Sequence, residues 1–218
     1  MKKIFVIITV IAISLTSLVF SIEMNAYNKS YYMGKYKENN VSNVTGKSME
    51  ELGTITDDLI LYLKGGCNDL LEPHFNSREV MHMEDVRSLF DLARTIKYLG
   101  MVSIIVAVFY FLKNKKLLKL ANTIFCGLFV NHSLLAIISI LAYNNFNKYF
   151  TYFHLIFFSN DLWILNPETD LMIQMLPENF FSGMALNILI TFLVFLSLLQ
   201  VVSLIYKNRN KPKSDRVK

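Results

Sequence analysis

Residues 76–112 read NSREVMHMEDVRSLFDLARTIKYLGMVSIIVAVFYFL, and their pattern predicts one long helix that begins outside a membrane and ends within it. Asn76 followed by Glu79 is typical of a helix start, because the asparagine oxygen accepts backbone N–H groups and the acid complements the helix dipole. His82 begins a single helical face with spacings of four and three, continued by Val86, Leu89, Ala93, Ile96 and Gly100. We therefore expect His82 to face the protein interior.

The composition excludes a soluble domain. The chain has 218 residues, of which 53% are hydrophobic and 18% charged, and its mean hydropathy is +0.38. A helix needs about 20 residues to cross the hydrocarbon of a bilayer, and four apolar runs approach or exceed this length: 4–22, 93–112, 120–143 and 182–206. We expect a single all-α membrane domain, residues 1–218, with four transmembrane helices.

The basic residues predict the orientation, since positively charged segments stay in the cytoplasm. Twelve Lys and Arg residues flank the apolar runs in three clusters, at 2–3, 113–119 and 207–218, with Asp215 as the only acid among them. Both termini are therefore predicted to be cytoplasmic, and segments 23–92 and 144–181 extracytoplasmic. The first run resembles a signal peptide, but no convincing cleavage site follows it, so we expect it to be retained. The pI near 9.1 thus indicates topology and not nucleic-acid binding.

The first outer segment is predicted to form a small helical cap. Ser48 and Glu51 make a capping box, and an apolar stripe at helical spacing continues to the glycines at 65 and 66. The stretch from Asn39 to Gly46 is rich in turn-forming residues and is expected to be a break.

The second outer segment places a histidine among aromatic residues. His154 shares a predicted helical face with Phe150, Phe153, Phe157 and Phe158. Trp163 follows, at a position typical of the membrane interface. Further on, the sequence NPE at 166–168 predicts an N-cap, a first-turn proline and an acid, opening a short helix that ends before Pro177.

Two histidines predicted to face inward, with acids nearby, permit acid–base chemistry. Glu79 and Asp85 lie three residues on either side of His82, and a carboxylate can orient an imidazole and raise its basicity. The alternative is that both histidines only pack. A metal site is disfavoured because no HExxH or paired CxxC motif is present, and a serine hydrolase because no GxSxG is present. His132, within the third run, could serve function or an interhelical hydrogen bond.

Two strings carry a resemblance to a known family, FNSREVMHMEDVRSL at 75–89 and FHLIFFSNDLWILNPETDLMIQMLPENFF at 153–181. Within four spans and an outer cap, they resemble the bacterial lipoprotein intramolecular transacylases (Lit). The resemblance implies an enzyme that moves an acyl chain from the diacylglyceryl group of a lipoprotein to the α-amino group of its N-terminal cysteine, giving the lyso form. It implies His82 and His154 as catalytic residues, and Asp85, Trp163, Asp170 and Pro177 stand at other family-like positions. With Glu79, which its spacing to His82 singles out, Asp85, Trp163 and Asp170 are the predicted supporting or substrate-binding residues.

The implied partners are diacylglyceryl-modified lipoproteins and membrane lipid, with no cofactor and no metal. The implied location is a bacterial cell membrane, with the active site on the extracytoplasmic side. Which histidine is the base stays open. Two rivals also stay open: a non-enzymatic membrane subunit or partner protein, and an acyltransferase that acts on free phospholipid.

Overall fold

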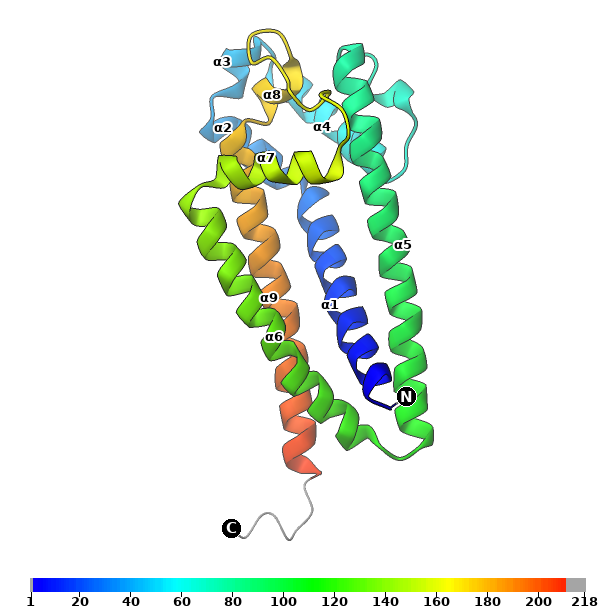
Figure 1. Cartoon of the computed structure of the whole chain (residues 1–218). Coiled ribbons are helices and arrows are strands. Elements are labelled where there is room, and N and C mark those ends of the chain that lie inside the picture. The colour runs from blue at the N-terminus through cyan, green and yellow to red at the C-terminus, as the bar shows by residue number, and fades with distance from the viewer. Residues whose placement is uncertain (1, 211–218) are drawn as a thin grey trace. The chain divides into compact units, whose positions relative to one another are not determined.

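The computed structural model describes residues 2–210, and within that range every regular element is a helix (Figure 1). In chain order these elements are α1 Lys2–Ala26, α2 Lys29–Glu38, α3 Val41–Thr45, α4 Met49–Leu63, the 3₁₀ helix η1 Asn68–Leu70, α5 Ser77–Lys113, α6 Leu117–Asn144, α7 Phe146–Phe157, α8 Leu171–Met175 and α9 Glu178–Arg209. The prediction of an all-helical chain is therefore confirmed for the described residues.

Four of the helices are long and apolar enough to cross a membrane: Phe5–Ala26 in α1, Ser77–Lys113, Leu117–Ile137 in α6, and Glu178–Arg209. They overlap the four predicted apolar runs. At 37 residues, α5 is far longer than the roughly 20 residues that spanning requires. Its first turns are thus available to build a site, and they carry His82.

The internal contacts divide the chain into two compact units. Of the described residues, 2–21, 94–140 and 188–210 form the first, which we call the span unit. Residues 22–93 and 141–187 form the second, which we call the histidine unit because it contains His74, His82 and His154. All six predicted site residues belong to the histidine unit.

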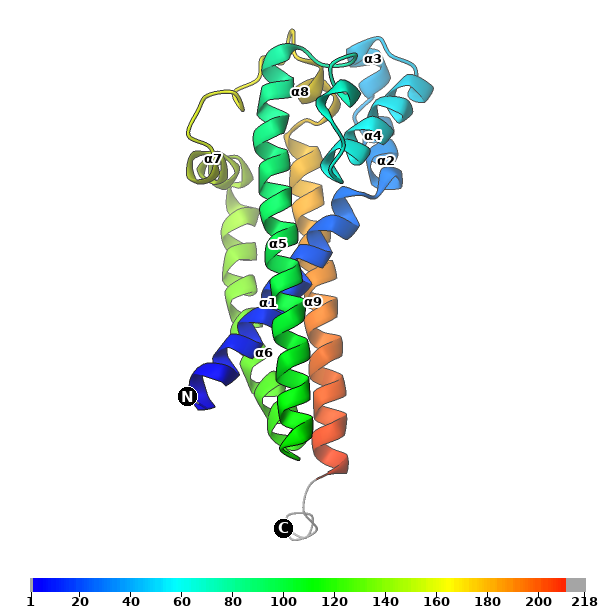
Figure 2. The same cartoon turned by 90° about the vertical axis from the view of Figure 1, so that its right-hand side faces the viewer.

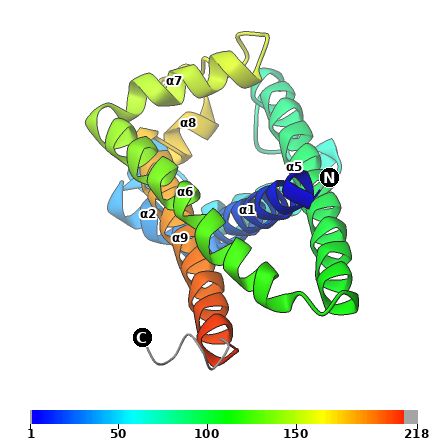
Figure 3. The same ribbon diagram turned by 60° about the horizontal axis from the view of Figure 1, so that its bottom comes forward.

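In the span unit, α1 is the helix against which the others pack, and Figure 3 shows it running between α5 and the pair formed by α6 and α9. The buried core joins Ile13 of α1 with Leu128 of α6 and Phe192 and Leu196 of α9. Gly100 lets α5 approach α1 closely, because a Cβ at this position would lie only 2.2 Å from Oγ1 of Thr16. Small residues at such crossings are typical of helices packed in membranes.

Polar side chains inside the span unit bond to neighbouring helices. Asn131 of α6 donates from Nδ2 to Oγ of Ser14 in α1, at 2.5 Å. The ring of His132 bonds to the Leu128 carbonyl at 2.8 Å through Nδ1 and to Oγ of Ser197 in α9 at 3.3 Å through Nε2. Interhelical hydrogen bonding, one of the two interpretations of this polar stretch, therefore accounts for His132.

The histidine unit has helices on both sides of the N-terminal part of α5: Figure 2 shows α2, α3 and α4 on one side and α7 on the other. The predicted capping box of Ser48 and Glu51 opens α4, and α4 ends at Leu63, just before the predicted glycine stop. Tyr36 of α2 is fully buried, and its hydroxyl bonds to Oγ1 of Thr56 in α4 at 2.9 Å. These contacts hold the small helices together.

Two local predictions in this unit are wrong. The stretch 39–46 contains a short helix, α3, between Asn40 and Gly46, which both have positive φ. Residues 167–169 form a turn and not the first turn of a helix, and α8 begins only at Leu171. The proline fits either structure, and the choice depends on distant contacts described below.

Candidate functional site

The start of α5 is fixed by the local pair that the sequence predicts. Oδ1 of Asn76 accepts hydrogen bonds from the backbone N–H groups of Arg78 and Glu79, at 2.9 and 3.1 Å. In return, Oε2 of Glu79 accepts the Asn76 N–H at 2.8 Å. Because the helix cannot begin elsewhere without breaking these bonds, the direction of His82, one turn later, is fixed as well.

His82 lies inside the histidine unit, as predicted, with only 7% of its surface exposed. Its ring contacts Phe158 edge-on, with 5.3 Å between centroids. Nδ1 of this ring is buried and has no hydrogen-bond partner among the described residues. A buried polar atom without a partner is costly and uncommon, so this nitrogen is available to a group that the chain itself does not supply.

His154 comes from the last turn of α7 and is buried to the same extent. Its Nδ1 donates to the carbonyl oxygen of Phe150 at 2.7 Å, since a carbonyl can only accept. In the neutral ring the lone pair is therefore on Nε2, which has no hydrogen-bond partner in the described part of the chain. Burial lowers the pKa of His154 below its ordinary value of 6.5, which favours the neutral ring at neutral pH.

The two imidazoles face one another within an aromatic wall. Their centroids are 6.2 Å apart and their planes are inclined by 33°. Phe158 contacts both rings, and the indole of Trp163 stacks on His154 at 4.7 Å and 26°. The structure thus brings together three of the predicted site residues, namely His82, His154 and Trp163.

The predicted shared face of α7 is only partly present. Phe150 and Phe153 contact His154 at 4.5 and 5.4 Å. However, α7 ends at Phe157, so Phe158 reaches the imidazole from the extended residue after the helix. Phe157 itself is 52% exposed. The aromatic layer exists, but it is assembled from a helix and the loop that follows it.

Glu79 holds two distant segments together. It is fully buried, and Oε1 accepts the backbone N–H of Met172 in α8 at 2.6 Å, while Oε2 accepts that of Asn76. A carboxylate from α5 therefore caps α8. Asp170, which stands at the N-cap position of α8, makes no capping bond there.

Asp170 instead closes the turn before α8 and binds α5. Its Oδ2 accepts the Asn166 N–H at 2.7 Å, and Oδ1 accepts from the Thr169 hydroxyl and from Nδ2 of Asn76, both at 3.0 Å. The bond from the Asn166 backbone is the main reason why the pKa of Asp170 lies below its ordinary value. These bonds close a turn from Asn166 to Asp170 just before α8 begins.

Asp85 takes part in a different contact. Its Oδ2 accepts a hydrogen bond from Nδ2 of Asn160 at 2.8 Å, and Oδ1 of Asn160 accepts the Leu162 N–H at 3.1 Å. Asn160 thereby fastens the loop that carries Trp163 to α5. Sequence reasoning missed Asn160, although an asparagine after a helix end is a common turn signal.

The predicted hydrogen bond from a carboxylate to an imidazole of this pair is not formed in the described part of the chain. Among the described residues, neither Glu79 nor Asp85 hydrogen-bonds to His82, and the group that orients His154 is the carbonyl of Phe150. His74 is engaged elsewhere, with its Nε2 2.8 Å from Oδ2 of Asp58. Within residues 2–210, no three His, Cys, Asp or Glu side chains are grouped as a metal site would require.

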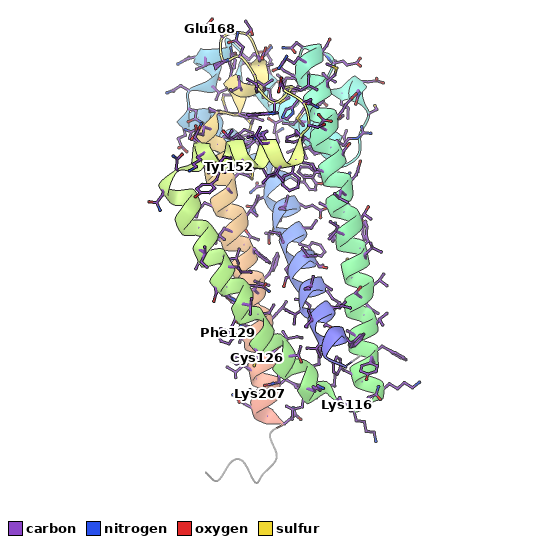
Figure 4. All side chains as sticks on the ribbon, in the orientation of Figure 1. Lys116, Cys126, Phe129, Tyr152, Glu168 and Lys207 are labelled. Atoms are coloured by element: carbon purple, nitrogen blue, oxygen red, sulfur yellow. The ribbon has the colours of Figure 1, made fainter. Side chains whose placement is uncertain are left out.

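The last turn of α7 exposes the apolar side chains that follow His154. Leu155, Ile156 and Phe157 each expose more than half of their surface, and Ile156 exposes 74%. Figure 4 labels Tyr152, another exposed aromatic residue of this helix, and Glu168 in the loop before α8. An apolar face of this kind is typical of a helix that lies in a membrane interface.

Comparisons with known proteins give a consistent result. A family model described as lipoprotein intramolecular transacylase Lit matches residues 7–181. No curated protein sequence matches the chain. A structure of the membrane integral lipoprotein intramolecular transacylase Lit from Bacillus cereus is 25% identical, with a TM-score of 0.77, and the match covers 96% of this chain and 98% of that one.

Two variant structures of the same Bacillus cereus protein are also similar. The one with a histidine-to-alanine substitution has a TM-score of 0.79 at 24% identity, covering 96% of both chains. The one with a histidine-to-arginine substitution has a TM-score of 0.78 at 24% identity, covering 95% of this chain and 93% of that one. The fold is thus that of a membrane enzyme.

Proposed function

The chain belongs to the lipoprotein intramolecular transacylase family, a family of membrane enzymes, and we propose that it carries out the reaction that this name describes. In this reaction an acyl chain leaves the diacylglyceryl group of a lipoprotein and joins the α-amino group of its N-terminal cysteine, which leaves a lyso-form lipoprotein. The chain is a multi-pass protein of a bacterial membrane. The observation that carries the proposal is the neighbouring pair His82 and His154, each with a ring nitrogen that no group among residues 2–210 occupies.

We assign His154 as the base because its lone pair is on Nε2. After the substrate ammonium has lost one proton to solvent, the amine attacks the ester carbonyl, and Nε2 takes the second proton from the amine nitrogen. The protonated ring then gives this proton to the glyceryl oxygen as the bond from carbon to that oxygen breaks. The products are an amide and an alcohol, and His154 returns to its neutral state.

We assign His82 as the hydrogen-bond donor to the tetrahedral oxyanion. With a proton on Nδ1, its ring would donate from a buried position to the charge that develops on the carbonyl oxygen. Such donors are most effective where water is excluded, as the aromatic surroundings of both rings favour. Since donor and acceptor belong to one substrate molecule, holding them together supplies much of the acceleration. This scheme requires no acyl-enzyme intermediate.

The surroundings suit a substrate anchored by acyl chains. Leu155 and Ile156, which follow His154 on α7, are apolar and exposed, and this suits a site beside the acyl chains of a lipid-anchored substrate. The distribution of basic residues predicts an extracytoplasmic histidine unit, which is where the lipid-modified cysteine of an exported lipoprotein would be found.

The test is mass spectrometry of N-terminal lipopeptides from a bacterium that lacks other N-acylating enzymes. We expect lyso-form peptides with the wild type and with His74→Ala, a matched control whose histidine is paired with Asp58. We expect only diacylglyceryl peptides with His154→Ala. Equal lyso-form yields from wild type and His154→Ala would remove the assigned base, and acyl transfer between lipids without lipoprotein would favour a phospholipid acyltransferase.

A further inference from the structure

The proposed reaction, on which this inference rests, brings a charged group to the site. An α-amino group has an unperturbed pKa of about 7.7–8.0, so at neutral pH it arrives mostly as an ammonium ion. The wall around His82 and His154 is aromatic and apolar. Burying a cation without an anionic partner is costly, so a carboxylate at the edge of the site would stabilise the ammonium ion as it binds.

Four carboxylates can be compared by how many of their oxygens accept hydrogen bonds: Glu79, Glu84, Asp85 and Asp170. Both oxygens of Glu79 accept backbone N–H groups, and both oxygens of Asp170 are likewise occupied. Glu84 is exposed and bonds to the side chain of Asn68. Asp85 is half-buried, uses only Oδ2, and keeps Oδ1 without a partner among the described residues.

Asp85 is also close to the reacting groups. It follows His82 by three residues on α5, which places the two Cβ atoms about 5–6 Å apart on adjoining turns. Asn160 holds the carboxylate through Oδ2, so Oδ1 is presented in a fixed direction. Nδ1 of His82 is buried and has no partner among the described residues. A polar group of the substrate is therefore expected next to this nitrogen.

We propose that Asp85 is the docking carboxylate for the α-ammonium group of the lipoprotein's N-terminal cysteine. It binds the charged amine through Oδ1 before the amine loses its proton, and so selects substrates whose amino terminus is free. A product already acylated on nitrogen has no ammonium group and loses this interaction, which favours its release.

A binding experiment without turnover tests the proposal. The ligands are a lipopeptide in which ethers replace both glyceryl esters, with either a free or an acetylated α-amino group, added at pH 7 to the protein in nanodiscs. Lipopeptides also partition into the nanodisc lipid, so the readout is the fluorescence of Trp163, the single tryptophan of the chain, which contacts His154. We expect the wild type to bind the free-amine ligand about tenfold more tightly than the acetylated ligand, as one charge-assisted hydrogen bond implies.

Three variants separate charge from structure. Asp85→Asn keeps an acceptor for Asn160 but lacks the charge, and should bind both ligands equally. Asp85→Glu restores the charge and should recover part of the preference. Asn160→Ala removes the tether and keeps the carboxylate, so it should weaken both ligands while keeping the preference.

The outcomes distinguish this inference from the proposed function. A wild type without a preference, or an Asp85→Asn variant that keeps it, overturns the docking role even if lipopeptides bind. If Asn160→Ala is the only variant that loses the preference, the preference depends on the bond from Asn160 and not on the charge of Asp85. If neither ligand binds to the wild type, the proposed lipoprotein substrate itself is wrong.

Discussion

His132 of the span unit and His154 of the histidine unit make the same local bond, from Nδ1 to the carbonyl four residues earlier. They differ at the other nitrogen. Nε2 of His132 is bonded to Ser197 of another helix, whereas Nε2 of His154 has no partner among the described residues. The first ring is fully used in holding helices together, and the second keeps its lone pair. A histidine's place in a membrane helix is thus a weaker guide to function than the state of its second nitrogen.

Replacing each histidine by alanine tests this comparison most strongly. With purified protein and a diacylglyceryl lipopeptide, we expect His154→Ala to lower the initial rate of lyso-form production by 10²–10⁴-fold, the usual contribution of a positioned acid–base group. His132→Ala removes only one interhelical bond and should change the rate by less than about threefold. Similar losses in both variants would mean that the free nitrogen of His154 has no special role.

The Glu79→Gln variant tests whether the free nitrogens depend on the placement of α5. The amide keeps one acceptor oxygen, but its NH₂ group then faces a backbone N–H. We therefore expect the free energy of unfolding to fall by about 1–3 kcal/mol. We expect the reaction rate to fall by about 10–100-fold. The thermal unfolding midpoint in detergent measures the first effect. Glu84→Gln, on the exposed face of the same helix, is the control. An unchanged midpoint in Glu79→Gln would contradict the clamp between α5 and α8.

The protonation of His154 can be followed through Trp163, because a protonated imidazole quenches an indole stacked on it. Burial lowers the pKa of His154 below 6.5, so the midpoint of the fluorescence decrease should lie below pH 6.5. The unfolded chain binds this proton at a higher pH than the folded chain does. The contribution of the neutral His154 ring to the free energy of unfolding is therefore present above pH 6.5 and is lost as pH falls toward the folded-state pKa. His154→Gln should abolish the fluorescence step and His132→Gln should not. A midpoint at or above 6.5 would contradict the neutral ring.

The smallest effect is expected at the stacked indole. An aromatic contact contributes about 0.5–1.5 kcal/mol beyond its buried area, so Trp163→Leu should lower the rate by about 2–10-fold. Trp163→Phe keeps a stacking ring, so it should raise the activation free energy by less than half as much as Trp163→Leu does. If the leucine and phenylalanine variants have the same rate, the ring of Trp163 does not orient His154. The Phe150 carbonyl is then the group that orients this imidazole.

The sequence predicts the parts of the site that depend on neighbours in the chain. The cap formed by Asn76 and Glu79, the inward direction of His82 and the four apolar helices all follow from spacings of three or four residues and from runs of about 20. The family resemblance implied both histidines, and their burial agrees with it, while their catalytic roles stay predictions.

Contacts between distant segments could not be predicted in this way. The bond from the Met172 N–H to Glu79 joins residues 93 apart, and the bond from Asn160 to Asp85 joins residues 75 apart. Asn166 does bind a nearby N–H, that of Glu168 at 3.0 Å, so its local signal is real. The turn that it begins is closed by Asp170, which accepts the Asn166 N–H, while the cap of α8 comes from Glu79 of α5.

The capping of α8 by Glu79 has a consequence for biosynthesis. A helix of five residues does not persist alone, and the acceptor for its Met172 N–H is made 93 residues before it. When the ribosome has completed α5, the carboxylate is in place but α6 and α7 must still be translated and inserted. The nascent chain therefore carries His82 without its finished surroundings, and we expect no enzyme activity until synthesis has passed Met172.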